Sequence, residues 1–198
     1  MSILVLTSDT LIGTPATGNL EYNGQFYGTD SNASRAQMQR ITQGTAVAST
    51  SGTSIDFTGL PAWCKRITVM FAGVSTSGTS VPMLRLGTSG GIESTGYGGS
   101  ETTCVGVNAG SYTKSISTGF DAAYDWSGPE VIGGQYIVSL IGSNIWVCTW
   151  TFGHSNGARM QFGGGTKTLS GTLDRIRLTT ANGTDTFDAG TINIMYEG

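Results

Sequence analysis

The sequence predicts an all-β protein in which an antiparallel two-sheet sandwich of the jelly-roll type follows a short N-terminal hairpin segment. Glycine supplies 31 of the 198 residues and only 12% of the residues are charged, against roughly 25% in ordinary domains. Hydrophobic residues still reach 38% and occur in short runs separated by turn-forming residues. Such runs are typical of strands, and no segment has the sustained period of a helix. Many short strands joined by turns predict a sandwich.

The chain divides by pattern into residues 1–44 and residues 45–198. The first part opens with adjacent apolar residues, which must be covered by something. They are Ile3, Leu4, Val5 and Leu6. We expect them to pair with a neighbouring chain or another partner. The alternative is that they form a first strand of the same domain.

Residues 19–28 predict a β-hairpin. Asn23 and Gly24 lie at its centre, and this pair favours a type I′ turn because both central positions need a positive φ. A two-stranded unit is marginal by itself in water, so we expect its large side chains to be buried against symmetry copies of the chain. These side chains are Leu20, Tyr22, Phe26 and Tyr27. Residues 30–44 are polar and predict a connector.

Residues 45–198 carry the strands of the expected sandwich, or head. The segment 66–74 is apolar on both faces, which is typical of a central strand. The last strand alternates Ile192, Ile194 and Tyr196 with other residues, the pattern of a half-buried strand. The complete set of expected strands is 45–49, 54–57, 66–74, 83–86, 104–108, 115–120, 135–141, 144–152, 159–162, 175–179 and 191–196.

Charge and hydropathy exclude several classes of protein. The net charge is −3, the isoelectric point is near 5.0, and the ten lysines and arginines are scattered. Nucleic-acid binding depends on clustered cations, so we expect none. No apolar run approaches the roughly 20 residues of a membrane helix, so we expect no membrane insertion. The first residues lack the charged region of a signal peptide, which predicts synthesis in a cytoplasm.

The cysteines and acidic loops predict neither a metal nor a cofactor. The cysteines are Cys64, Cys104 and Cys148. They are odd in number and widely spaced, which excludes a zinc site and predicts free thiols. Oxygen ligands for Ca²⁺ occur in the segment 180–190 at Asn182, Asp185 and Asp188. Their spacing does not match that of an EF-hand loop.

Carboxylate pairs are the residues that could support glycoside hydrolysis, which needs two of them about 5–10 Å apart. The candidates are Glu93 with Glu101, and Asp121 with Asp125 and Glu130. All lie in glycine- and serine-rich stretches, where exposed acids serve solubility. The chain also lacks the repeat of a β-helix and has no nucleophile motif to accompany its single histidine. We therefore predict no enzymatic activity.

Two segments are candidates for ligand recognition. Residues 87–103 are polar and glycine-rich, with one tyrosine between glycines, and residues 121–130 carry aromatics among acids. Exposed aromatics provide rigid contact area and can stack on a sugar ring. The alternatives are that Trp126 folds back onto the core and that the glycine-rich loop is an assembly contact. The full set of candidate ligand-binding residues is Tyr97, Tyr124, Asp125, Trp126, His154, Asn156 and Arg159.

Three segments resemble those of a known class of protein. Residues 52–74 read GTSIDFTGLPAWCKRITVMFAGV and residues 171–198 read GTLDRIRLTTANGTDTFDAGTINIMYEG. Both resemble the head domain of bacteriophage tail-fibre and related virion proteins. Residues 14–29, TPATGNLEYNGQFYGT, resemble the strand-turn-strand that leads into such heads, where three chains wind together. The resemblance implies a non-enzymatic homotrimer located in the virion.

The resemblance gives each part of the chain an expected role. Residues 1–44 are expected to wind the trimer and to attach it to other tail or capsid proteins, and residues 45–198 to form a head that binds a host-surface glycan. The alternative is a capsid decoration or head-fibre protein without a receptor role. A free carbohydrate-binding module is a further alternative, in which the apolar N-terminal residues would lack partners.

Overall fold

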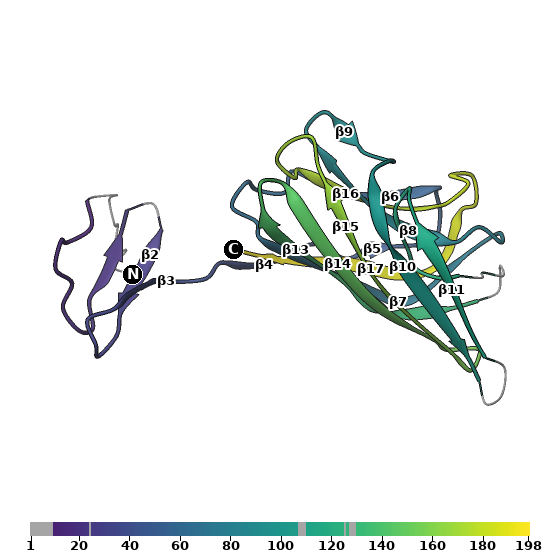
Figure 1. Ribbon diagram of the computed structural model, residues 1–198, viewed down its shortest axis with the longest axis horizontal. Helices are drawn as coiled ribbons and strands as arrows, with labels where there is room; N and C mark the ends of the chain where they lie inside the picture. Colours follow the sequence, from purple (N-terminus) through teal and green to yellow (C-terminus); the bar gives the residue numbers. More distant parts are fainter. Residues whose placement is uncertain (1–9, 24, 107–109, 125, 127–129) are drawn as a thin grey trace. The chain divides into compact units, whose positions relative to one another are not determined.

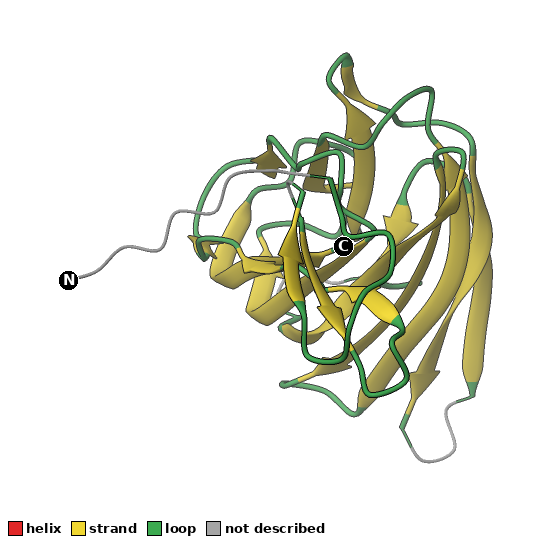
Figure 2. Ribbon diagram, turned by 90° about the vertical axis from the view of Figure 1, so that its left-hand side faces the viewer, coloured by secondary structure: helices red, strands yellow, loops and turns green. Residues whose placement is uncertain are grey.

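The computed structural model describes residues 10–23, 25–106, 110–124, 126 and 130–198. These residues form strands, turns and loops, and Figure 2 shows no helix among them. None of them accordingly belongs to a helix long and apolar enough to cross a membrane. Several antiparallel sheets account for the strands, so the all-β class predicted from the sequence is confirmed. The chain separates into two compact units, residues 1–40 and 41–198.

The smaller unit contains one three-stranded antiparallel sheet. Its strands are β1 (Leu20–Tyr22), β2 (Phe26–Thr29) and β3 (Arg35–Gln37), in that order. Glu21 of β1 is buried, and its carboxylate accepts hydrogen bonds from Arg35 Nε at 2.7 Å and from the amide of Ile12 at 2.8 Å. The rings of Tyr22 and Phe26 lie 4.9 Å apart. The connector expected over 30–44 is wrong, because β3 and β4 (Ile41–Gln43) lie within it.

The apolar residues expected to make contacts between chains are only partly covered within this unit. Leu20 is 62% exposed and Phe26 is 44% exposed, whereas Tyr22 and Tyr27 are half-buried. The remaining residues of that expected set, Ile3, Leu4, Val5 and Leu6, lie outside the described residues.

The larger unit contains a nine-stranded sheet (Figure 1). Its order begins with four strands, β11 (Ser111–Ile116), β10 (Tyr97–Val105), β15 (Arg159–Thr168) and β14 (Ile145–His154). It continues with β13 (Ile132–Gly142), β7 (Arg66–Thr76), β17 (Phe187–Glu197) and β4, and β5 (Val47–Ala48) also pairs with β17. The segment predicted to be central, β7, lies between β13 and β17 as expected.

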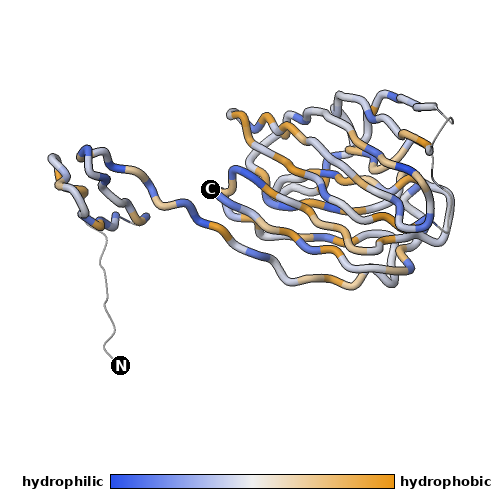
Figure 3. The backbone as a smooth tube through the Cα atoms, turned by 90° about the horizontal axis from the view of Figure 1, so that it is seen from below, coloured by the Kyte–Doolittle hydropathy of each residue, from blue (hydrophilic) through white to orange (hydrophobic). Residues whose placement is uncertain are grey.

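A second sheet has five strands. They are β12 (Phe120–Asp121), β8 (Pro82–Thr88), β16 (Arg175–Thr180) and β6 (Ser54–Thr58), with β9 (Gly91–Ile92) paired to β8. Side chains from both sheets form one hydrophobic core, and hydrophobic residues alternate with hydrophilic ones along many strands (Figure 3). Tyr136 is fully buried there, and its hydroxyl donates a hydrogen bond of 3.0 Å to the carbonyl of Phe120. This bond ties the nine-stranded sheet to β12 of the second sheet.

Two expected strands were placed wrongly. The strand expected at 104–108 begins earlier, because β10 spans Tyr97–Val105 and pairs with a strand on each side. The strand expected at 115–120 is two strands, β11 and β12, which belong to different sheets. The loop predicted over 87–103 is therefore mostly strand.

The register of the strands defines two ends of the larger unit. Ile132 pairs with both Val74 and His154, and Val105 pairs with Arg159. These pairings place the loops 77–81, 155–158 and 181–186, together with the described residues 106, 110, 122–124, 126, 130 and 131, at one end, which we call the far end. Ile41, where the larger unit begins, pairs with Glu197 at the opposite end, which we call the near end.

Candidate ligand-binding site

A pair of exposed tyrosines lies at the far end of the larger unit. Tyr112 is 49% exposed and Tyr124 is 38% exposed, and their rings stack with centroids 5.6 Å apart at an interplanar angle of 18°. The register of β10 with β11 sets Tyr112 opposite Thr103, and Thr103 Oγ1 accepts a 3.2 Å hydrogen bond from the amide of Tyr124. The pair is thus held by two strands and a following loop.

The tyrosine pair borders a pocket of about 350 Å³. The residues that line it are Thr103, Val105, Tyr112, Tyr124 and Arg159. This volume lies within the range of roughly 300–1,000 Å³ that small-molecule sites occupy. Its lining combines two aromatic rings with a hydroxyl and a guanidinium group, which is a composition suited to a ligand with both apolar and hydroxylated faces.

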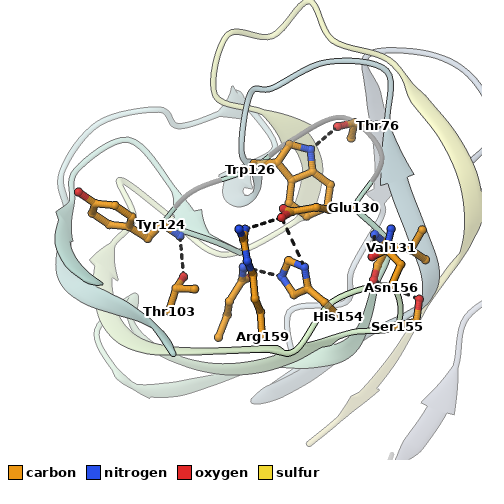
Figure 4. A network of polar contacts seen from close by, with 11 residues as sticks. Thr76, Thr103, Tyr124, Trp126, Glu130, Val131, His154, Ser155, Asn156 and Arg159 are labelled. Atoms are coloured by element: carbon orange, nitrogen blue, oxygen red, sulfur yellow. Dashed lines mark hydrogen bonds and ion pairs between the residues drawn. The ribbon is translucent and has the colours of Figure 1, made fainter. Parts of the chain in front are cut away.

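Arg159 connects the pocket to a buried polar network (Figure 4). Its Nη1 donates to Oε1 of Glu130, and the same oxygen lies 3.9 Å from Nδ1 of His154. The amide of Gln161 lies 2.7 Å from the other ring nitrogen of His154. Burial lowers the pKa of His154 against the opposing effect of Glu130, so the imidazole is neutral at pH 7 and the network carries one ion pair.

The predictions for His154 and Trp126 require correction. His154 ends β14 and its side chain is only 1% exposed, so it does not contact solvent from a loop. Trp126 is buried, with its Nε1 donating a 2.7 Å hydrogen bond to Thr76 and its ring 6.2 Å from that of His154. The alternative, in which Trp126 folds back onto the core, is therefore confirmed. Trp126 and His154 are buried beside the polar network that reaches Arg159.

Two further candidates of this group have different positions. Asn156 is exposed, and its Oδ1 accepts a 3.1 Å hydrogen bond from the amide of Val131, so it joins two loops at the far end. Asp125 lies outside the described residues. Of the seven residues expected to bind ligand, the structure thus places Tyr124 and Arg159 on the pocket, His154 in the polar network that reaches Arg159, and Trp126 beside His154.

Tyr97 lies at the other end of β10, so its expected position in an exposed loop is wrong. It is buried, and its hydroxyl accepts a hydrogen bond from the amide of Leu86 at 2.8 Å and lies 2.9 Å from the carbonyl of Glu93. Tyr97 and Val105 are the two ends of this nine-residue strand, about 26 Å apart at the usual rise per residue. Tyr97 is a core residue.

Two of the acids predicted to be exposed, Glu101 and Asp121, belong to a buried cluster. Lys114 Nζ lies 3.2 Å from Glu101 Oε1 and 2.9 Å from Asp121 Oδ2. The Glu101 side chain has no exposure, and burial raises its pKa to about 7. Burial also raises the pKa of Asp121. Neither carboxylate is among the described residues that line the pocket, so the cluster is not placed to act on a ligand bound there.

The described acidic residues and cysteines form neither a metal site nor a disulfide. Within these ranges, no group of three or more histidine, cysteine, aspartate and glutamate side chains could hold an ion. The acidic segment 180–190 uses its polar groups for turns: Asp185 accepts hydrogen bonds of 2.8 Å from the amide of Ser80 and from Asn182. Cys64, Cys104 and Cys148 are free thiols, as predicted.

The sequence pattern missed Tyr112 and Thr103, which complete the site. Tyr112, Lys114 and Ile116 alternate along β11 and face the same side as Glu101 and Thr103 of β10. That alternation was a usable signal, but it was obscured by the glycine and serine residues around it.

The site can bind a ligand by stacking and hydrogen bonding. The described residues that line its pocket include no carboxylate, cysteine, serine or histidine. Comparison with known proteins found no matching family model, no matching curated protein and no matching solved structure.

Proposed function

We propose that the protein is a structural virion protein of a bacteriophage, a trimeric tail-fibre-like head that binds a host-surface glycan and is not an enzyme. The observation that carries the glycan site is the stacked, exposed pair of Tyr112 and Tyr124 beside the 350 Å³ pocket. The virion assignment is supported by the resemblance of residues 52–74, 171–198 and 14–29. In this proposal the two sheets form a jelly-roll-like sandwich and the N-terminal segment intertwines with its copies.

A saccharide fits the chemistry of the pocket. The C–H face of a pyranose ring is apolar, and an exposed tyrosine offers it a rigid surface at low entropic cost. The guanidinium of Arg159 lines the same pocket, and its donors other than Nη1, which donates to Glu130, supply hydrogen-bonding groups for sugar hydroxyls. A weak site is sufficient, because linked copies can raise the apparent affinity by about 10²–10⁴-fold.

The place of the site within the larger unit suits display. The larger unit begins at Ile41, at the near end, whereas the pocket lies at the far end. A head attached to a virion through residues 1–44 would therefore present the opposite end of its strands. This arrangement supports a receptor role over a capsid decoration role.

Substituting Tyr124 and Tyr112 by alanine tests the site. Loss of both rings is expected to weaken binding of the purified protein to host cells about tenfold or more, by analogy with nucleic-acid bases, whose stacking on one aromatic ring contributes roughly 1–3 kcal/mol. Phe162→Ala is the matched control, because Phe162 is 47% exposed on β15 but does not line the pocket. Unchanged binding in the double variant would refute the site. Failure of the unaltered protein to bind host cells would favour the capsid decoration alternative.

The trimer is tested through the exposed apolar residues of the smaller unit. Light scattering at micromolar concentration is expected to give three times the chain mass of 20.6 kDa. Leu20→Ser with Phe26→Ser is expected to give the monomer, because these side chains are 62% and 44% exposed in a single chain and association would bury them. Since both lie outside the larger unit, its thermal unfolding should not change. A monomeric unaltered protein would contradict the proposal.

A further inference from the structure

The far end of the larger unit is poor in positive charge. The described residues of the loops at this end include no lysine or arginine, whereas they include Glu130 and Asp185. Arg159, which follows one of these loops, is the cation on the pocket itself. Any ligand that depends on several positive charges is therefore disfavoured at this end.

The charge of Arg159 is already matched. Its guanidinium contacts the carboxylate of Glu130, and the two side chains are only 28% and 10% exposed. Ion pairs between arginine and a carboxylate are strong and directional when they are partly shielded from water. The next cation along the same face, Lys114, lies between Glu101 and Asp121. Each of these two described cations thus has a carboxylate partner.

We infer that the pocket takes an uncharged saccharide, and that Glu130 sets this selectivity by occupying the guanidinium that would otherwise bind an anionic sugar. The inference rests on the proposed glycan-binding function and adds the charge class of the ligand. A carboxylate or phosphate on the sugar would have to compete with Glu130 for the charge of Arg159, because arginine binds such groups through its guanidinium donors. It would also approach an acidic end of the protein.

Direct binding to matched saccharides tests this selectivity on the full-length protein. The probes are oligosaccharide pairs, each a neutral hexose or N-acetylhexosamine chain beside the same chain with a uronic acid or phosphate on its terminal sugar. The neutral member is expected to bind about tenfold tighter, because the anionic group loses water without gaining a free cationic partner. Raising the salt concentration should strengthen binding of the anionic member only, because salt screens repulsion.

Glu130→Gln tests the assigned selectivity residue. Removing the carboxylate frees the guanidinium of Arg159, so affinity for the anionic member is expected to rise about tenfold, while binding of the neutral member confirms that the variant is folded. Asp56→Asn is the matched control: it removes the same charge and frees Arg177, which Asp56 binds at 2.7 and 2.6 Å on the second sheet. This control should leave the preference unchanged.

The outcomes separate the inference from the function on which it rests. Equal or tighter binding of the anionic member by the unaltered protein overturns the selectivity and leaves the glycan site standing. An unchanged preference in Glu130→Gln, with neutral binding retained, overturns the role of Glu130. Binding of neither member overturns the inference together with the proposed glycan site. If the unaltered protein binds the neutral member more tightly and Glu130→Gln loses this preference, both the selectivity and the role of Glu130 are supported.

Discussion

Glu101→Gln is expected to stabilise the protein at pH 8, by up to about 3 kcal/mol. Glu101 has no exposed side-chain surface, and burial raises its pKa from 4.5 to about 7. At pH 8 the folded protein therefore contains an ionised carboxylate that burial destabilises, although Lys114 lies 3.2 Å away. Glutamine has the same shape without the charge, so the destabilising ionisation is removed.

The expected pH dependence has a defined sign. Between pH about 4.5 and about 7, the folded state retains a proton on Glu101 that the unfolded state has lost, so the free energy of unfolding falls as the pH rises through this range. Below this range the two proteins should have similar stability. Urea unfolding from pH 4.5 to 8.5 measures both curves. A variant that is less stable than the unaltered protein at pH 8 would show that the ion pair with Lys114 outweighs the burial.

Glu93→Gln is a useful control, because the expected sign is opposite. Burial opposes ionisation of Glu93, but hydrogen bonds from Lys167 and Ser170 outweigh it and lower the pKa. The stability contributed by this carboxylate is therefore present at neutral pH and lost as the pH falls through its folded-state pKa. The variant should be less stable than the unaltered protein at pH 8, whereas Glu101→Gln should be more stable.

Gly163→Ala is expected to destabilise the protein by about 1–3 kcal/mol, the usual effect of overfilling a packed core. Gly163 lies in β15 opposite Trp150 in the neighbouring strand, and a Cβ at this position would overlap the indole ring. Trp150 is itself buried among Phe120 and Tyr136, so its ring has little space into which to move.

The adjacent glycine provides the control for this substitution. A Cβ on Gly164 would point to the other face of the sheet, where its nearest neighbour is the carbonyl oxygen of Cys148 at 4.0 Å. Gly164→Ala is expected to change the free energy of unfolding by no more than about 0.5 kcal/mol, as for most surface substitutions. Thermal or urea unfolding of the two variants makes the comparison. Equal effects would mean that strand propensity, and not the contact with Trp150, decides the outcome.

Strands with a strong local pattern could be predicted from the sequence. The segments that became β7, β13, β14 and β17 alternate large apolar residues with other residues, and burial of one face fixes their register. The central position of β7 followed from its two apolar faces. In these strands the information that selects the structure lies within the strand itself.

Other features depended on partners distant in the sequence. The stretch 97–103 has little β propensity, yet its backbone pairs with β11 and β15 on its two sides, and tertiary pairing outweighs propensity. Trp126 is buried, and its indole N–H donates a hydrogen bond to Thr76, 50 residues earlier. Glu101 and Asp121 are buried, and Lys114 forms ion pairs with both carboxylates. Composition alone could not show these pairings, so it assigned the same residues to exposed loops.

The opposite placement of Ile41 and the pocket has a mechanical consequence. A tension applied between a ligand held at Tyr124 and a chain anchored at Ile41 would run along the strands, since β4 and β17 pair at the near end and β10 and β15 end at the pocket. Loading in this direction shears the interstrand hydrogen bonds together instead of opening them one after another from an edge. The sheet is therefore expected to resist a force applied between Ile41 and the ligand at Tyr124 better than a force applied perpendicular to the strands.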